Sequence, residues 1–112
     1  MTNCLFCKMV SGEIKPDTIF EDDNVLAFRD INPQAPVHIL IIPKRHIATL
    51  NDLDDAELSA QLLQTAVNLA KQEGLSEAGY RTVFNCNRNG GQAVYHLHLH
   101  LLGGRQMTWP PG

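Results

Sequence analysis

The sequence is poor in cysteine, in aromatic residues and in net charge. Its three cysteines are an odd number, which does not suit the disulfide framework of a small secreted domain. No run approaches the roughly 20 apolar residues of a membrane-spanning helix, and the first residues lack the basic and apolar regions of a signal peptide. The formal net charge of -3 and the dispersed lysines and arginines argue against a nucleic-acid polymer as the partner. We therefore expect a cytoplasmic protein that makes no membrane contact.

The residues that are present suit one globular domain over 1–112. With 112 residues, 44% of them hydrophobic, the chain is long enough for one core and too short for two. Apolar periodicity, glycine and proline predict helices at 5–10 and 54–73 and strands at 24–30, 37–42, 80–86 and 94–102. Asp54 and Glu57 resemble a capping box, and 87–91 is typical of a polar turn. This order predicts an α+β domain with a mostly antiparallel sheet, one long helix and a short N-terminal helix.

Three histidines, His96, His98 and His100, alternate with leucines in the last expected strand. Side chains on a strand alternate between faces, so the histidines share one face while the leucines pack on the other. The histidines can be hydrogen-bonded core residues, they can converge on a metal ion, or one can attack phosphorus while its neighbours position it and donate a proton. The preceding Gly90-Gly91 favours nucleophilic catalysis, because glycine amides can hold phosphate oxygens, although two glycines often mark only a turn.

The segment 96–102 resembles the His-φ-His-φ-His-φ-φ signature, φ being apolar, of the histidine triad (HIT) superfamily. The resemblance extends through the segments 28–38, 42–44, 90–92 and 102–107. The closing Trp109-Pro110-Pro111-Gly112 is similar to the end of the Hint branch, the purine nucleoside phosphoramidases. The resemblance implies a HIT-like fold and a homodimeric hydrolase that cleaves the P–N bond of purine nucleoside phosphoramidates, such as AMP-amine or AMP-lysine compounds.

The same resemblance implies roles by position. His98 is expected to become nucleotidylated and then to be freed by water. His100 and His38 are expected to assist proton transfer and phosphate contacts, while the carbonyl of His96 orients the His98 ring. Asp30 suits the ribose hydroxyls. The other nucleotide-binding positions that the resemblance implies are Ile31, Asn85, Gly91, Gln92, Ala93, Val94 and Trp109.

Two of these positions bear on substrate specificity. Ala93 stands where eukaryotic members usually carry serine, and alanine donates no side-chain hydrogen bond, so the efficiency or the leaving-group preference is expected to differ. Trp109 belongs either to a frayed tail or, as the resemblance implies, to a specificity element near the partner subunit's active site. Two other functions stay open: a dinucleoside polyphosphate hydrolase or nucleotidyl transferase, which the Trp-Pro-Pro-Gly ending disfavours, and a zinc-stabilised nucleotide-binding scaffold with incidental turnover.

Cys4 and Cys7 form a C-x-x-C pair, whose sulfurs lie on one side of a helix or turn, as a zinc half-site requires. Such a pair can also be incidental or redox-active. His46 and His96 are available as two further ligands, and some bacterial HIT proteins resemble this arrangement. A closed Cys2His2 shell leaves no position for substrate, so the expected zinc is structural. Cys86 stands apart and is expected to be a buried core thiol.

Overall fold

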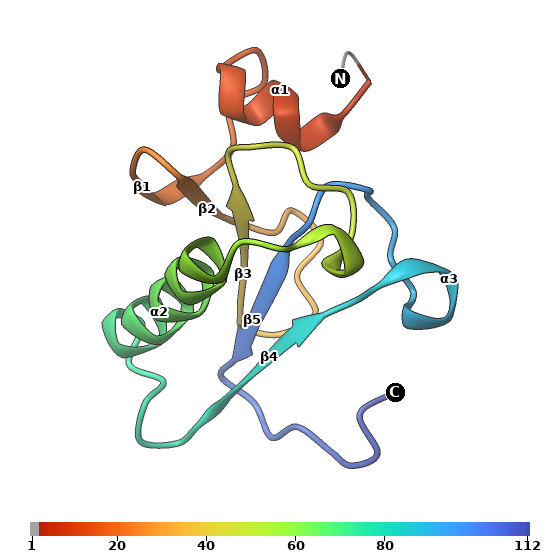
Figure 1. The fold of residues 1–112 in the computed structure, drawn as a ribbon. Helices are drawn as coiled ribbons and strands as arrows, with labels where there is room; N and C mark the ends of the chain where they lie inside the picture. Colours follow the sequence, from red (N-terminus) through yellow and green to blue (C-terminus); the bar gives the residue numbers. More distant parts are fainter. Residues whose placement is uncertain (1–2) are drawn as a thin grey trace.

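The computed structural model describes residues 3–112 and shows the predicted α+β fold, with a five-stranded, wholly antiparallel sheet (Figure 1). The strands lie in the order β1-β2-β3-β5-β4, so the sheet places the last strand between two earlier ones. The elements in chain order are α1 (Leu5–Ser11), β1 (Thr18–Glu21), β2 (Val25–Arg29), β3 (Val37–Pro43), the 3-10 helix η1 (Leu50–Asp52), α2 (Ala56–Gln72), β4 (Tyr80–Phe84), α3 (Asn87–Gly90) and β5 (Leu99–Gly103).

The structure differs from the sequence-based prediction in several places. Strand β1 was not predicted, because it has four mostly exposed residues and no alternation of buried and exposed side chains. The predicted strand at 94–102 begins only at Leu99, and the predicted turn at 87–91 contains the short helix α3. The N-cap of α2 is Asp55, which accepts from the Leu58 amide, so the predicted capping box of Asp54 and Glu57 is wrong.

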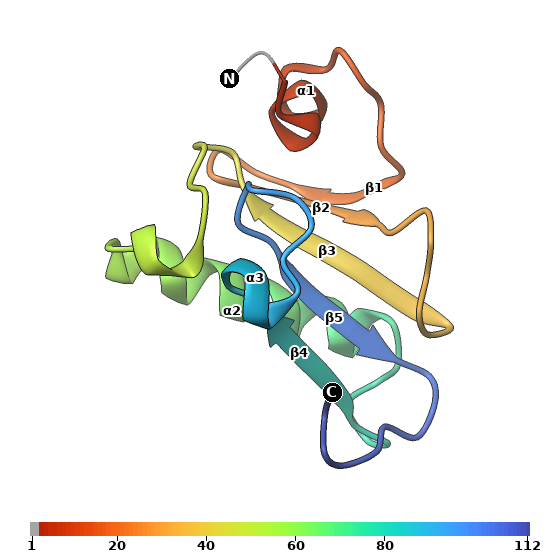
Figure 2. The same ribbon diagram turned by 90° about the vertical axis from the view of Figure 1, so that its right-hand side faces the viewer.

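The sheet buries both of its faces, and the alternation of side chains along each strand divides the core into two layers. Val25 and Ala27 of β2 face α2, together with Leu62 and Leu69 of that helix. Leu26 and Phe28 of the same strand face the opposite way and pack against Phe6 of α1. Figure 2 shows α1 and α2 on opposite sides of the sheet. The short N-terminal helix is therefore the cover of one sheet face.

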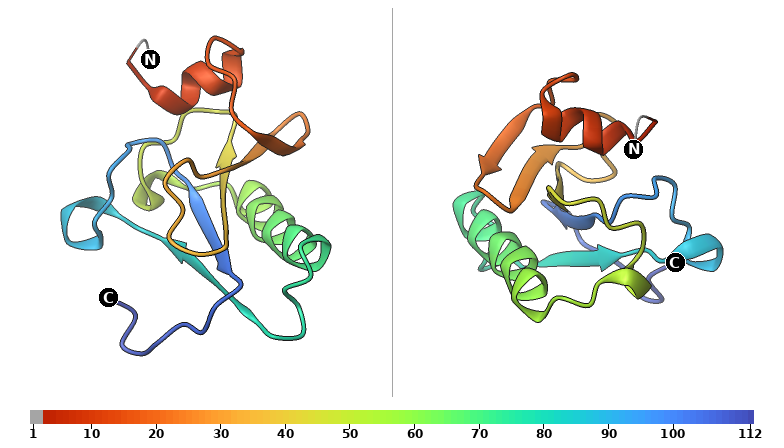
Figure 3. Two further views of the ribbon diagram at one scale, coloured as in Figure 1. Left: turned by 180° about the vertical axis from the view of Figure 1, so that it is seen from behind. Right: turned by 45° about the horizontal axis from the view of Figure 1, so that its top comes forward.

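After β5 the chain turns and returns on the β4 side of the sheet, where its C-terminal end lies (Figure 3). Arg81 of β4 donates from Nη2 to the carbonyl of Thr108 at 2.9 Å. Among the described residues, no helix has the length and apolar character needed to cross a membrane.

Candidate active site and metal centre

Two histidines from neighbouring strands meet on the sheet face that α1 covers. In the β3–β5 pairing, Leu40 is opposite His100 and His38 is opposite Leu102. His38 and His100 therefore occupy diagonal positions on one face, and their ring centroids lie 5.2 Å apart. His38 is 6% exposed, so its ring is buried.

Hydrogen bonds determine which nitrogen of each of these two rings carries the proton. The Gln34 amide donates to Nδ1 of His38 at 3.0 Å, so a neutral His38 carries its proton on Nε2. That Nε2 lies 2.9 Å from Nδ1 of His100 and 3.6 Å from a carboxylate oxygen of Asp30. When His38 donates to His100, the proton of a neutral His100 is on Nε2. That Nε2 is buried without a hydrogen-bond partner in the part of the chain that the structure describes, so it is a donor left free for a ligand.

His98 has the complementary arrangement. Its Nδ1 lies 2.8 Å from the carbonyl oxygen of His96, so a neutral ring donates from Nδ1 and leaves the lone pair of Nε2 free. The His98 ring is 8% exposed and lies 4.9 Å, centroid to centroid, from the His100 ring. The site thus presents a nitrogen lone pair and a nitrogen-bound proton from adjacent rings.

Burial keeps these rings neutral, because a charged imidazolium loses hydration in the interior. Burial lowers the pKa of His98, although the His96 carbonyl and the charge of Asp30 partly oppose this shift. Burial, with repulsion from His98 and His38, lowers the pKa of His100 to about 4. The pKa of His38 is also lowered, chiefly by burial, with Asp30 opposing. Near neutral pH the three rings are therefore in the tautomers described above.

A cavity of about 400 Å³ lies beside these rings, within the size range of ligand sites. His98 and His100 line it, and so do four more of the predicted nucleotide-binding residues, Asp30, Ile31, Ala93 and Val94. Its apolar wall was missed by sequence reasoning, because no motif marks it and residues distant in sequence form it. These wall residues are Leu5, Phe6, Met9, Ile14, Phe28 and Leu40.

Four predicted nucleotide-binding residues do not line this cavity: Asn85, Gly91, Gln92 and Trp109. Gln92 is buried, and its side chain forms hydrogen bonds within the protein. The side-chain amide donates to the carbonyls of Ala48 and Val94, and its oxygen accepts from the backbone amide of Asn87. Gly91 caps the C-terminal end of α3 with a φ of 76°. Glycine adopts this left-handed conformation easily, which accounts for a glycine at this position. Asn85 is half-buried. Trp109 is 81% exposed in the described structure, which does not distinguish a frayed tail from a specificity element.

The four predicted metal ligands come together, with their ligand atoms all within 4.8 Å of one another. Sγ of Cys7 lies 3.2 Å from Nδ1 of His46, and Sγ of Cys4 lies 3.3 Å from Nδ1 of His96. In a tetrahedral zinc site, with Zn–S of about 2.3 Å and Zn–N of about 2.0 Å, sulfur and nitrogen ligands lie about 3.5 Å apart. The donor set and its spacing therefore fit zinc.

Surrounding groups also orient this Cys/His cluster, which comprises Cys4, Cys7, His46 and His96. Nε2 of His96 lies 2.8 Å from the Pro43 carbonyl, a bond that leaves Nδ1 free to ligate. Burial and the neighbouring Cys4 raise the pKa of the Cys7 thiol, so a bound cation would offset an unfavourable thiolate pair. Cys86 lies outside the cluster, and it is half-buried, so the expectation of a buried core thiol is wrong.

Comparison with known proteins places this geometry in a family. Residues 11–107 match the model of the HIT domain. The purine nucleoside phosphoramidase of Escherichia coli K12 is 50% identical over 105 residues, which cover 92% of this chain and 88% of that protein. The adenylylsulfatase HINT1 of Arabidopsis thaliana is 55% identical over 96% of this chain and 76% of that protein. The 14 kDa zinc-binding protein of Brassica juncea is 54% identical over 96% of this chain and 98% of that protein.

The fold agrees with these sequence relationships. A crystal structure of a HIT family hydrolase from Legionella pneumophila superposes with a TM-score of 0.96 at 68% identity, covering 98% of this chain and 100% of that one. The family match spans most of the chain, two of the sequence relatives named above carry enzyme names, and the superposed structure is a HIT family hydrolase. The chain therefore belongs to the HIT family and is a hydrolase of that family.

Proposed function

We propose that the protein hydrolyses the P–N bond of purine nucleoside phosphoramidates through a nucleotidyl-histidine intermediate on His98. The observation that carries this proposal is the pair of opposite tautomers beside one cavity. Among residues 3–112, Nε2 of His98 keeps a free lone pair and the N–H on Nε2 of His100 has no partner. A neutral, buried imidazole is a competent nucleophile, and a neighbouring N–H can stabilise charge and deliver a proton.

The proposed reaction has two displacements at phosphorus. Nε2 of His98 attacks, the N–P bond to His98 forms and the bond to the leaving nitrogen breaks, while His100 gives its Nε2 proton to the departing amine. His100 is then an imidazolate, and its negative charge is balanced by the positive phosphorylated ring of His98 beside it. The Nδ1 proton of His98 stays on the ring and is donated to the His96 carbonyl, and this hydrogen bond stabilises the positive ring of the intermediate. Water then attacks phosphorus, its proton passes to His100, and AMP leaves as the bond to His98 breaks. The net change is a phosphoramidate and water giving AMP and an amine.

The apolar wall of the cavity suits a purine, and Asp30 at its rim suits ribose hydroxyls. A second candidate substrate follows from the adenylylsulfatase name of one relative: adenylyl sulfate, whose sulfate leaves from the same nucleotidyl-His98 intermediate. The deciding experiment compares turnover of adenosine 5'-phosphoramidate, adenylyl sulfate and a diadenosine polyphosphate, and traps the intermediate by acid-free mass spectrometry. Negligible turnover of all three, with AMP still bound, would favour a binding scaffold instead.

We also propose that the Cys/His cluster holds one structural zinc ion. The ligand spacing supports this, as does the zinc-binding name of a relative. We expect purified, reduced protein to contain about one equivalent of zinc by elemental analysis, and we expect cobalt to give the visible absorption of a tetrahedral site with two thiolates.

Replacement of one ligand tests this zinc assignment. Cys7→Ser removes a thiolate and should lower the metal content to a small fraction, whereas Cys86→Ser should leave it unchanged, because Cys86 lies outside the cluster. Equal zinc in the two variants, or less than a few tenths of an equivalent in the unaltered protein, would contradict the site. Since the cluster uses reduced thiols, we place the protein in a reducing compartment, the cytoplasm.

We further propose a homodimer. Leu63 and Val67 on the outer side of α2 are each 47% exposed, and Tyr80 on the edge strand β4 is 37% exposed, so apolar side chains remain uncovered on two elements that are consecutive in the chain. Sedimentation velocity should give a mass twice the 12.5 kDa of one chain. Leu63→Lys should shift that mass toward the monomer, and a monomeric unaltered protein at micromolar concentration would contradict the dimer.

A further inference from the structure

One aromatic side chain, Phe6, connects the cavity to both histidine systems. It is 3% exposed and lines the cavity wall. Its ring centroid lies 5.2 Å from that of His98 and 5.9 Å from that of His96, both in edge-to-face geometry. Such contacts fix ring orientation as well as burying area. The position of Phe6 therefore gives it two roles: it restricts the orientation of the His98 ring, and it forms part of the cavity wall.

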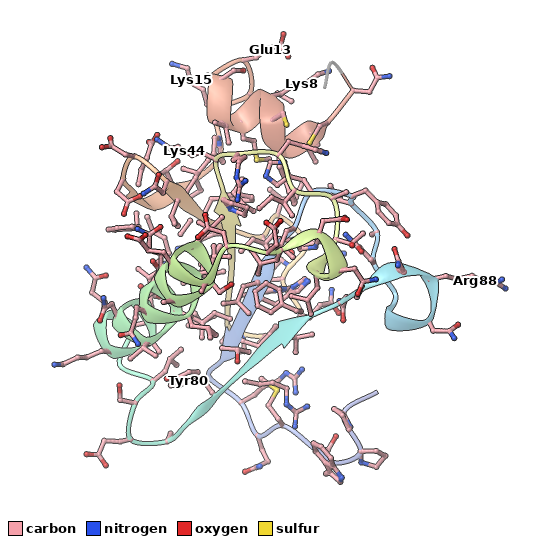
Figure 4. All side chains as sticks on the ribbon, viewed as in Figure 1. Lys8, Glu13, Lys15, Lys44, Tyr80 and Arg88 are labelled. Atoms are coloured by element: carbon pink, nitrogen blue, oxygen red, sulfur yellow. The ribbon has the colours of Figure 1, made fainter. Side chains whose placement is uncertain are left out.

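The helix that carries Phe6 is too short to be stable alone. α1 has seven residues, whereas isolated helices shorter than about 12 residues are marginal in water. Its inner side chains pack on the sheet through Phe6, Met9 and Val10, while Figure 4 shows Lys8 on its outer side, with Glu13 and Lys15 of the following segment also pointing outward. Something beyond propensity must hold this helix in place.

The Cys/His cluster supplies that attachment. Cys4 is the N-cap of α1 and Cys7 lies in its first turn, so two of the four ligands bracket Phe6 in sequence. The other two ligands, His46 and His96, come from the body of the domain. A metal ion shared by the four would tie residues 4–7 to a scaffold that is 39 to 92 residues away in sequence.

His96 is a second link between the cluster and the nucleophile. Its Nδ1 faces Cys4, and its backbone carbonyl lies 2.8 Å from Nδ1 of His98. His96 is thus both a member of the Cys/His cluster and the residue that orients the His98 ring, whose Nε2 presents the free lone pair. A shift of His96 would move the acceptor on which the His98 tautomer depends.

We propose that metal ligation by the Cys/His cluster positions Phe6 and His98, so that metal loading sets both the nucleotide affinity of the cavity and the orientation of the nucleophile. Phe6 is here a positioning residue, not a catalytic one. Without the ion, α1 is held by the packing of Phe6 and its neighbours and by the weaker thiol–imidazole contacts of Cys4 and Cys7, so the cavity wall that it forms is held less firmly. This inference rests on the proposed nucleotide-binding function of the cavity.

Thermodynamic linkage gives the sharpest test. If metal strengthens AMP binding by some factor, AMP must strengthen metal binding by the same factor, and coupling between sites is typically about 5–150-fold. We expect AMP affinity, measured by calorimetry on the full chain, to fall about tenfold on metal depletion and to return when zinc is added. Zinc affinity measured with and without saturating AMP should change by the same factor. An AMP affinity that is equal within twofold in the two forms would overturn the proposal.

Two readouts report on the link itself and need no nucleotide. Amide exchange of residues 4–12 should become faster on metal depletion while that of β2 and β3 stays slow, and the NMR resonance of the His98 Nδ1 proton should broaden or shift. Unchanged exchange and an unchanged resonance would overturn the coupling. If the unaltered protein bound no AMP in any state, the proposed function would fail, while these two measurements would still decide the coupling.

Single-residue variants distinguish the contribution of Phe6 to AMP binding from that of the metal ion. Cys7→Ser should reproduce the metal-depleted behaviour, and Cys86→Ser is the matched cysteine control outside the cluster. Phe6→Leu keeps all four ligands and an apolar wall, so it should bind zinc normally yet lose most of the zinc dependence of AMP binding. If Phe6→Leu keeps the full dependence, Phe6 is not the link. If Cys7→Ser fails to fold, chelator titration of the unaltered protein gives the same comparison.

Discussion

Replacement of His98 by alanine should lower the kcat/KM for adenosine 5'-phosphoramidate by about 10⁴-fold or more, since loss of the nucleophile in covalent catalysis costs about that much. Nε2 of His98 is the one imidazole lone pair that the described hydrogen-bond pattern leaves free beside the cavity, because His38 and His100 use theirs to accept bonds. No other histidine of the triad can take over the attack, since His96 turns its ring to the Cys/His cluster. Steady-state kinetics with a continuous assay of amine release gives the measurement.

The matched control for His98→Ala is Tyr95→Ala, which alters a neighbour of the triad that is 47% exposed and outside the cavity. That variant should stay within a few-fold of the unaltered rate. The pH dependence supplies a second check: because burial lowers the pKa of His98, Nε2 stays unprotonated below pH 6.5, and kcat/KM should begin to fall only at a more acidic pH. Turnover by His98→Ala within tenfold of normal would reject the covalent mechanism.

The alternation of histidine and leucine was informative in the sequence even though half of the segment is not in a strand. Extended backbone alternates its side chains whether or not it pairs, so Leu97 and Leu99 reach the α2 layer of the core while His98 faces the other way. The ladder starts only at Leu99, because the chain before it bonds elsewhere, with the Leu97 amide donating to the Ile47 carbonyl at 2.6 Å. That bond joins residues 50 apart and has no local sequence signal.

The parts of the site that sequence reasoning could not reach depend on strand register and on packing between layers. The diagonal placement of His38 and His100 requires Leu40 to lie opposite His100, a pairing that neither strand specifies by itself. The wall contributed by α1 depends on how this helix packs on the sheet face that carries His38 and His100, the face opposite α2. By contrast, the four-ligand cluster was predictable, because thiol and imidazole side chains carry recognisable chemistry wherever the fold brings them together.

Replacement of His100 by leucine should lower kcat by about 10²–10³-fold with a smaller change in KM, because a positioned donor acts mainly on the charge that develops in the transition state. Nε2 of His100 is buried with no partner in the described part of the chain, and the pKa of the ring lies at about 4, so a neutral N–H faces the cavity at physiological pH. An amine that leaves easily needs less help from a proton donor. The loss should therefore be largest for alkylamine phosphoramidates and smallest for those with an aniline-type leaving group.

The tautomer of His100 depends on His38, and a pair of variants tests that dependence. His38→Gln keeps a side-chain N–H that can donate to Nδ1 of His100. His38→Leu instead leaves Nδ1 of His100 and the Gln34 backbone amide without the hydrogen-bond partner that His38 provides. The leucine variant should thus lose several times more kcat than the glutamine variant, and the nitrogen-15 shifts of His100 should show a mixture of tautomers only with leucine. Equal losses, with unchanged His100 shifts, would mean that His38 does not set the proton position, and that the donor at Nε2 of His100 is maintained by the substrate itself.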